Sequence, residues 1–521
     1  MAVALLLLLC LFRLTGLPVS VDEHGGYSQS LKLKLISVKH ANGCLENRKF
    51  LLVSVHGHAI NTLECLLASA DEAASAQIGV NYGQLGNNLP SASHSVALIK
   101  SLRAKAVKIY DANPAILEAL SATDMRVSIM VPNQAIANIS SSQAAADAWI
   151  HANLLPFYHR AKIRVVLVGN EILSDQSNKA TWFQLVPAMR NIKRSLSALR
   201  IRNVKVGTPF AMDTLETSFP PSSGAFRKDI ADPVVRPMLQ FLAKTKSSFF
   251  IDVYPYFAWS GNPNSISLDY ALFRVTKPTY TDPGSGLSYT NLLDQQLDSV
   301  IAAMAKLGVA NVPLTIAETG WPNACDLDQI GANVANAAAY NRNLARRLAA
   351  NPPVGTPARP GKPIPTYIFS LYNENQKPGP GTERHWGLLY PNGSAIYEID
   401  LTGRRPESSY KPLPEGTNNQ PYKGKIWCVA DAAVAGRREN ASQVAGALQY
   451  ACGQGKGTCD SIRPGKACYN PNNLLAHASF AFNAYWQQFR KSGGTCYFNG
   501  LAVQTATDPS HGSCVYPALS P

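Results

Sequence analysis

The sequence predicts an α/β protein: a closed parallel (β/α)8 barrel, the TIM-barrel architecture, followed by a small disulfide-rich module. Three observations support this prediction. Short apolar runs alternate with longer helical patterns through the middle of the chain. Two of these runs end in a polar turn that carries a carboxylate, at Glu171 and at Glu318. Six of the ten cysteines gather in about the last hundred residues, beyond the last of these runs.

Eight short β-type runs are predicted as strands, because each is followed by a polar turn. They cover residues 78–82, 107–110, 126–131, 165–169, 204–208, 249–253, 314–317 and 367–371. Helical patterns fall between them, at residues 93–102, 143–158, 182–199, 237–245, 292–307 and 334–349. This alternation over about 320 residues favours a closed barrel. The alternative is an open doubly wound sheet, but the turn from Gly83 to Gly86 lacks the third glycine of a phosphate-binding fingerprint.

The chain is predicted to divide into four segments. They are a signal-like segment with an unpatterned insertion or pro-region at 1–76, the barrel at 77–402, a Pro-rich linker at 403–425 and the cysteine-rich module at 426–517. The module ends without a hydrophobic tail, so the sequence signals no glycosylphosphatidylinositol anchor.

The first segment begins with an apolar run at residues 2–12 that resembles a signal-peptide core and is too short to span a membrane. The stretch that follows has no clear periodicity and holds two odd cysteines, Cys44 and Cys65. Small residues precede Gln77, so we expect secreted material to begin near that residue.

Composition excludes several classes of protein. A hydrophobic content of 46% with only 16% charged residues is typical of a packed globular chain rather than a disordered one. The net charge of +14 is spread without a basic run or recognition-helix pattern, so we expect no nucleic acid partner. Weak attraction to an acidic wall matrix, or simple solubility, explains this charge better.

The clustered cysteines predict a disulfide framework and therefore an oxidising, extracellular compartment. They are Cys428, Cys452, Cys459, Cys468, Cys496 and Cys514. Zinc binding is the alternative, but no close Cys-x-x-Cys pair with a matching histidine is present. We expect neither a metal nor any other cofactor.

Glu171 and Glu318 are candidate catalytic residues because the carboxyl ends of barrel strands line the active site. A single glutamate at such a place more often caps a strand end. Two at one rim are the equipment of a glycoside hydrolase, in which one carboxyl protonates the departing oxygen and the other attacks the anomeric carbon or activates water. The carboxyl groups lie roughly 5–5.5 Å apart in retaining enzymes and roughly 6.5–9.5 Å apart in inverting ones.

Aromatic residues at predicted strand ends suggest platforms for sugar rings, although each alone is more often a packing residue. They include Tyr82, Tyr254 and Trp321. The last strand leads to Glu374, Lys377 and Glu383, a group that either hydrogen-bonds sugar hydroxyls or forms a surface salt-bridge network.

Several of these runs together resemble plant endo-β-1,3-glucanases of glycoside hydrolase family 17. The resemblance spans about residues 77–400 and rests on motifs at 78–83, 107–111, 168–171, 253–257 and 318–322, and on Asn373, Glu374, Lys377 and Glu383. It implies a barrel that retains anomeric configuration, with Glu318 as nucleophile and Glu171 as general acid/base. It also implies that substrate contacts Tyr82, Asn170, Tyr254, Trp321, Glu374, Lys377 and Glu383.

The chain departs from the family pattern at two places in the cleft wall. Asn323, Ala324 and Cys325 stand where Ser or Thr and then Gly are usual, and Asp252 stands where an Asn is often found. These departures bear on subsite preference more than on the basic chemistry.

The C-terminal module resembles a family 43 carbohydrate-binding module, on its six cysteines, Trp427 and the aromatic-rich stretch at 480–486. The resemblance implies binding of β-1,3-glucan and the bridges Cys428–Cys496, Cys452–Cys459 and Cys468–Cys514. A purely structural appendage is the alternative.

The expected function is therefore that of a secreted, wall-associated endo-hydrolase of β-1,3-glucan, acting as a monomer with no transmembrane segment. The alternatives are a mixed-linkage β-1,3-1,4-glucanase, a wall transglycosylase, or a glucan-binding wall protein with an inactive barrel. Product analysis on laminarin and on barley glucan separates these possibilities.

Overall fold

The computed structural model describes residues 32–37, 49–55, 58–60 and 78–518. The signal-like run, Cys44, Cys65 and the expected start at Gln77 lie outside the described residues. Residues 1–74 form a unit of their own. Within it, β1 (Lys32–Ser37), β2 (Lys49–Val55) and β3 (His58–Ile60) pair as an antiparallel sheet, which the sequence reading did not predict.

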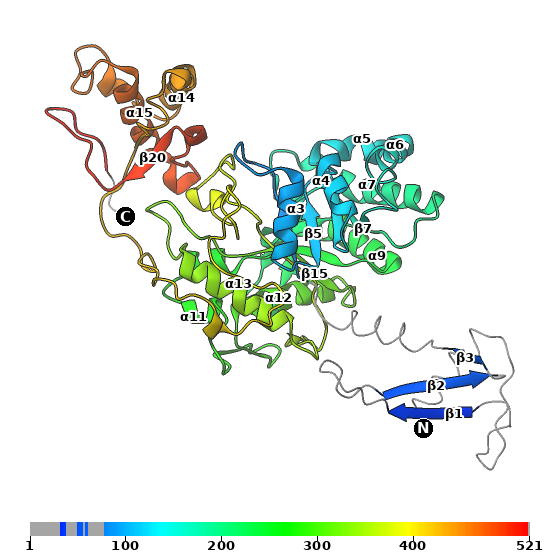
Figure 1. The fold of residues 1–521 in the computed structure, drawn as a ribbon. Helices are drawn as coiled ribbons and strands as arrows, with labels where there is room; N and C mark the ends of the chain where they lie inside the picture. The colour runs from blue at the N-terminus through cyan, green and yellow to red at the C-terminus, as the bar shows by residue number, and fades with distance from the viewer. Residues whose placement is uncertain (1–31, 38–48, 56–57, 61–77, 519–521) are drawn as a thin grey trace. The chain divides into compact units, whose positions relative to one another are not determined.

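The second unit contains a parallel sheet that returns on itself (Figure 1). Its strands in chain order are β4 (Ile78–Tyr82), β5 (Ala106–Ile109), β6 (Arg126–Val131), β7 (Lys162–Val168), β8 (Lys205–Gly207), β9 (Pro209–Ala211), β12 (Phe249–Asp252), β15 (Leu314–Thr319) and β18 (Thr366–Ile368). The hydrogen-bonded order begins at β8 and ends at β9. Because only Thr208 separates these two, they are the halves of one broken strand, and the predicted eight-stranded barrel is confirmed.

Helices surround the strands (Figure 1). The longer ones are α3 (Ala92–Ser101), α4 (Pro114–Ser121), α6 (Gln143–Asn153), α7 (Lys179–Ala198), α9 (Arg236–Thr245), α12 (Leu292–Lys306) and α13 (Val334–Leu348). Several begin at a polar side chain that accepts a hydrogen bond from the first turn, as Asn113, Asn291 and Asn333 do. Shorter helices include α5 (Ile136–Ser141), α8 (Lys228–Ile230), α10 (Pro255–Gly261) and α11 (Leu268–Ala271).

Two apolar layers hold the barrel together. The outer layer packs the helices against the strands in one continuous cluster that includes Trp182, Phe249 and Trp321. A small inner cluster of Met130, Leu167, Phe250 and Ala317 fills the barrel interior. Strands buried on both faces explain why these runs are apolar without alternation.

The predicted linker, residues 403–425, has little regular structure but is bound to the barrel. Asn418 donates from Nδ2 to the carbonyl of Ala332 at 3.0 Å, and the Gly331 amide donates to the carbonyl of Asn418 at 2.7 Å. The Asn419 side-chain oxygen accepts from Asn336 at 2.8 Å. Asn418 and Asn419 are therefore fixed to the loop that follows β15 and to the start of α13.

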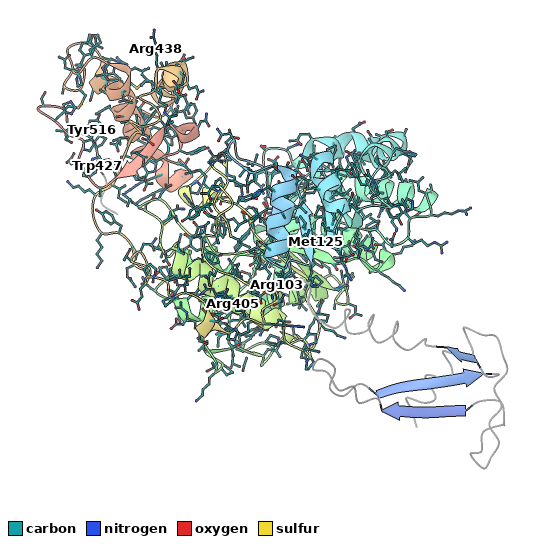
Figure 2. All side chains as sticks on the ribbon, viewed as in Figure 1. Arg103, Met125, Arg405, Trp427, Arg438 and Tyr516 are labelled. Carbon is teal, nitrogen blue, oxygen red and sulfur yellow. A yellow bond between two sulfur atoms is a disulfide. The ribbon has the colours of Figure 1, made fainter. Side chains whose placement is uncertain are left out.

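The module comprises β19 (Trp427–Ala430), α14 (Ala441–Gly453), α15 (Leu474–Phe489) and β20 (Ala502–Thr505). Its disulfides join Cys428 to Cys496, Cys452 to Cys459 and Cys468 to Cys514, the pairing that the resemblance implies. Trp427 and Tyr516 (labelled in Figure 2) belong to a small apolar cluster around the third bridge. No helix in the described part of the chain is long and apolar enough to cross a bilayer.

Candidate active site

A cavity of about 480 Å³ opens at the carboxyl ends of the barrel strands. Both candidate catalytic glutamates line it, together with Asn170, Tyr254, Glu374, Lys377 and Glu383. The remaining lining residues are Gly83, Gln84, Leu85, Tyr110, Asp111, Phe257, Phe369 and Trp386. Residues separated by up to about three hundred positions thus meet at one place.

Glu318, in β15, is 5% exposed and accepts three hydrogen bonds. Lys108 Nζ lies 2.6 Å from Oε1, the Tyr110 hydroxyl donates to the same oxygen at 2.5 Å, and the Tyr254 hydroxyl donates to Oε2 at 2.7 Å. Burial alone would raise the pKa of Glu318, but the Lys108 ammonium and these hydrogen bonds lower it below its ordinary value. Glu318 is therefore held as a carboxylate.

Glu171 follows β7 through a sharp turn, in which Gly169 has φ +72° and Glu171 itself has φ +50°. Its backbone amide donates to the carbonyl of Pro209 at 3.1 Å, which fixes the turn. Burial and the nearby charge of Glu318 raise the pKa of Glu171 to about 7. Two carboxyl groups in one cavity thus have pKa values displaced in opposite directions, which is the arrangement that an acid and a nucleophile require.

Asp252 is a third carboxyl group in this cluster. It ends β12, pairs in register with Glu318, and is 2% exposed with neither carboxyl oxygen hydrogen-bonded to a described residue. Burial first, and then the charge of Glu318, raise its pKa well above the usual range. Asp252 is therefore an acid whose ionisation is disfavoured beside Glu318 and Glu171.

The loop after β18 supplies a polar wall. Glu374 accepts a hydrogen bond from the Leu85 amide at 2.8 Å, and burial raises its pKa. A side chain at Gly83 would meet the Glu374 carboxylate, so glycine allows this close approach without displacing Glu374. Lys377 Nζ lies 3.4 Å from Glu383 Oε2 and 4.2 Å from the centre of the Phe369 ring.

The aromatic residues divide into two groups. Tyr254, Phe257 and Trp386 line the cavity and pack against one another. Trp321 is fully buried, with its indole nitrogen donating to the Gly331 carbonyl at 2.8 Å, and Tyr82 is only 3% exposed against Tyr372. Their burial leaves no face on which a sugar ring could pack, so these two predicted contacts support the cavity from behind.

Three residues of the cluster were not among the sequence-based candidates: Lys108, Tyr110 and Asp252. The signal was present for Lys108, because a lysine inside an apolar strand needs a buried partner. Its partner lies 210 positions away, and no local pattern identifies it.

The sequence profile of glycosyl hydrolases family 17 matches residues 78–401. The chain belongs to that family. The glycosyl hydrolases family 17 match covers every strand of the barrel and every residue of the cavity described above. An X8 domain profile matches residues 426–503, which contain most of the disulfide-rich module.

Relatives and solved structures of family 17 agree with this assignment. The probable glucan endo-1,3-beta-glucosidase A6 of Arabidopsis thaliana is 53% identical over 445 residues, which cover 85% of this chain and 92% of that protein. A glucan endo-1,3-beta-D-glucosidase of Olea europaea is 37% identical over 444 residues, covering 85% and 94%. The solved structure of CJP38, a beta-1,3-glucanase and allergen of Cryptomeria japonica pollen, covers 62% of this chain and 99% of its own, with 42% identity and a TM-score of 0.59.

Proposed function

We propose that this protein is a secreted hydrolase that cleaves internal 1,3-β-D-glucosidic linkages of β-1,3-glucan with retention of configuration. The observation that carries the proposal is the pair of glutamates in one cavity, with the pKa of Glu318 lowered and that of Glu171 raised to about 7. The relatives of this chain are glucan endo-1,3-beta-glucosidases, which supports the choice of linkage.

In the first step, a carboxylate oxygen of Glu318 attacks the anomeric carbon and the bond from that carbon to the departing sugar oxygen breaks. Glu171 gives its proton to the departing oxygen, so the leaving sugar departs as a neutral alcohol. Tyr110, Tyr254 and Lys108 hold Glu318 in place through its two oxygens. The product is a glycosyl ester on Glu318 and a deprotonated Glu171.

In the second step, water attacks the anomeric carbon from the side that the leaving group vacated, and Glu171 takes the proton of that water. The ester bond breaks and Glu318 leaves as a carboxylate. Both side chains return to their starting protonation states. Attack by a sugar hydroxyl in place of water would give the transglycosylase alternative.

Several groups in the cavity suit sugar hydroxyls. The side-chain oxygen of Asn170 is buried without a hydrogen-bond partner among the described residues and lies next in sequence to Glu171. Glu374, Lys377 and Glu383 add charged hydrogen-bonding groups to the same cavity. Phe257, which is 48% exposed, offers an aromatic face at its edge.

The module would bind β-1,3-glucan and keep the barrel on its polymer, which raises the effective substrate concentration. Its three disulfides support an extracellular, wall-associated location, and we expect a monomer. Deleting residues 426–521 is expected to lower the rate on insoluble glucan about tenfold while leaving the rate on short soluble chains within twofold.

The decisive experiment follows the purified protein on laminarin and on defined 1,3-β-oligosaccharides by proton NMR, with barley mixed-linkage glucan in parallel. Initial release of β-anomeric oligosaccharides from laminarin supports the proposal. Initial α-anomers exclude retention. A faster rate on barley glucan favours the mixed-linkage alternative, and glucan binding without turnover favours an inactive binding protein.

A further inference from the structure

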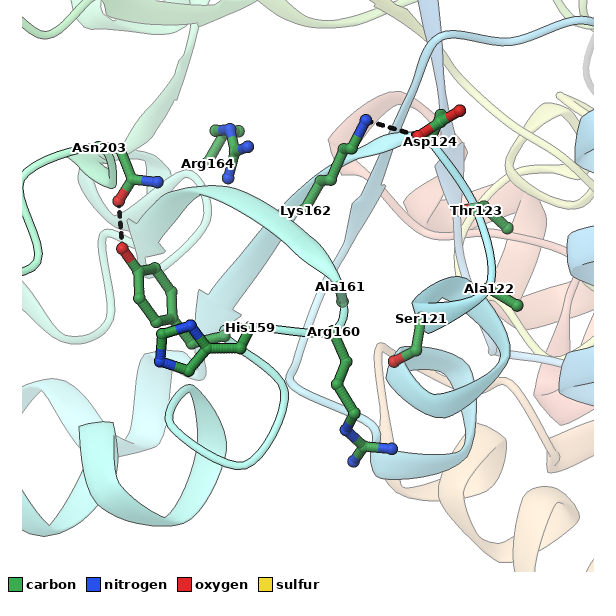
Figure 3. A pocket seen from close by; sticks show the side chains of 11 residues that line it. Ser121, Ala122, Thr123, Asp124, His159, Arg160, Ala161, Lys162, Arg164 and Asn203 are labelled. Atoms are coloured by element: carbon green, nitrogen blue, oxygen red, sulfur yellow. Dashed lines mark hydrogen bonds and ion pairs between the residues drawn. The ribbon is translucent and has the colours of Figure 1, made fainter.

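The barrel has a second cavity, at the amino ends of its strands (Figure 3). Its volume is about 570 Å³. The lining comes from the turns that lead into β6, β7 and β8, and it includes three cations, Arg160, Lys162 and Arg164. None of its lining residues belongs to the cavity that holds the glutamates.

The cations of this cavity continue a row along the sheet. Lys105 directly precedes β5, and Arg126, Lys162 and Lys205 are the first residues of β6, β7 and β8. Arg126 of β6 lies in register with Lys162 of β7. Lys205 of β8 pairs with Val165, which follows Lys162 by three residues on β7. Because neighbouring strands are about 4.8 Å apart, Arg126 and Lys162 lie side by side, and Lys105 and Lys205 add positive charges at the same end of the two flanking strands.

Carboxylates neutralise only part of this row. Among the described residues, Asp124 pairs with Lys162 at 2.6 Å and Glu118 pairs with Arg160 at 2.7 Å, and both acids are largely exposed. Arg164 donates only to the carbonyl of Ile163, at 3.1 Å, and lies within ion-pair distance of no described carboxylate. The amino end of β5 to β8 therefore has an excess of positive charge in reach of solvent.

Neutral hydrogen-bonding groups stand beside these cations. The lining includes the hydroxyls of Ser121 and Thr123, and the amide of Asn203, which accepts from the Tyr158 hydroxyl at 2.5 Å. In Figure 3 Lys162 and Arg164 project on the same side of their strand, with Asn203 beside Arg164. Guanidinium groups bind carboxylates in two-pronged geometry, and hydroxyl and amide groups suit sugar hydroxyls.

We propose that this amino-end surface, defined by Lys105, Arg126, Arg160, Lys162, Arg164 and Lys205, is a binding site for a polyuronate, a polysaccharide whose sugar rings carry carboxylates. A row of charges along several strands suits a repeating polymer better than a single small anion. The three disulfides place the chain in an oxidising compartment, where carboxylated polysaccharides rather than nucleic acids are the expected polyanions. The site is independent of the hydrolase proposal, since it shares no residue with the glutamate cavity.

Occupation of this surface would leave the glutamate cavity open, because amino and carboxyl ends of barrel strands lie on opposite faces. The protein could therefore be held on an acidic polymer while its other end engages a neutral one.

The test uses the full chain and polygalacturonate as the probe, with affinity measured by electrophoresis in polygalacturonate-containing gels and by calorimetry at low salt. The triple variant Arg126→Gln, Lys162→Gln and Arg164→Gln is expected to bind about tenfold more weakly, since each exposed ion pair contributes modestly. The matched control Lys179→Gln, Lys228→Gln and Lys277→Gln loses the same charge from other exposed positions and is expected to stay within twofold. Polygalacturonate with its carboxyls methyl-esterified is expected not to bind.

Equal weakening by both triple variants would overturn the proposal, because the attraction would then follow net charge alone. Equal affinity for the esterified polymer, or for duplex DNA through the same three residues, would also overturn it. Unchanged laminarin hydrolysis and thermal midpoint show that each variant is folded. Should the triple variant fail to fold, Arg126→Gln alone, at an exposed position, is expected to weaken binding two- to threefold, and no change would overturn the site.

Discussion

Two lysine–carboxylate pairs of the same length, 2.6 Å, lie at opposite ends of the barrel. The side chains of Lys108 and Glu318 are 0% and 7% exposed, whereas those of Lys162 and Asp124 are 44% and 97% exposed. Distance alone would make the two pairs equivalent. Burial makes them different, because water screens the second pair strongly and the first pair only weakly.

The charged groups at the two ends of the barrel therefore have different roles. At the carboxyl end, the buried carboxyls of Asp252 and Glu318 and the partly buried one of Glu171 interact electrostatically, and Lys108 contacts Glu318, so each proton affinity depends on the others. At the amino end, cationic side chains outnumber acidic ones, and solvent anions can reach them and exchange around them. Electrostatics at the first end controls protonation, while at the second it is available for binding.

The largest expected effect is that of Glu318→Ala, which removes the proposed nucleophile. Turnover of laminarin should fall by at least about 10⁴-fold, as for other nucleophile deletions. Circular dichroism and retention on insoluble glucan should match the unaltered protein. Residual activity above one per cent would contradict the nucleophile role.

Glu171→Gln should lower kcat on laminarin about 10²- to 10⁴-fold, because the departing oxygen then receives no proton. Aryl glucosides with activated leaving groups should retain a much faster glycosylation step, seen as a burst of phenol. The unaltered enzyme needs Glu171 protonated, and its pKa is about 7, so kcat/KM should decline as the pH rises through about 7. Equal slowing for good and poor leaving groups would refute the acid role.

Lys108→Met tests the buried ion pair directly. It leaves Glu318 charged without its cation, so stability should fall by about 3–5 kcal/mol and kcat/KM by about 10²-fold. The pKa of Glu318 is lowered in the native enzyme, so loss of Lys108 should move the acidic limb of the pH profile to higher pH.

The control for this variant is Lys162→Gln at the other end, where the partner carboxylate is exposed. Laminarin kinetics and urea unfolding should both remain unchanged. If the two lysine variants have similar effects on activity, the contrast between buried and exposed pairs is wrong.

The smallest expected effect is that of Asp252→Asn, because the raised pKa of Asp252 favours its neutral form and the amide has the same shape. Activity on laminarin should stay within about threefold of that of the unaltered enzyme. The alkaline limb of its pH–activity profile should hardly move. A matched control is Asp298→Asn, a buried aspartate on α12 outside the cavity. A shift of the alkaline limb to lower pH by a full unit would mean that Asp252 carries a negative charge near Glu171.

Local pattern was sufficient for the positions of the barrel strands and for the two glutamates, because each glutamate lies at the end of a β-type run that a turn residue marks. Local pattern did not predict side-chain orientations and partners that depend on long-range packing. Trp321 follows such a run as well, yet it turns into the core against Trp259 and Tyr340. The ion pair of Lys108 with Glu318 joins residues 210 positions apart, so the local motif around Lys108 could not reveal it.

The broken fifth strand has a similar origin. Residues 204–208 are predicted as one strand, but in the structure the strand extends to Ala211 and breaks at Thr208, so that β8 pairs with β7 and β9 with β12. Pairing partners are non-local, and composition does not reveal where a strand changes partner.

The binding of Asn418 and Asn419 to the barrel limits how far the module can travel. Only residues 420–425 separate these anchors from the start of the module, and a fully extended chain of that length spans about 20 Å. A short linker therefore keeps the module close to the barrel. If the module binds β-1,3-glucan as proposed, a strand that it holds is presented to the barrel of the same molecule, and cuts close to the point of attachment are favoured.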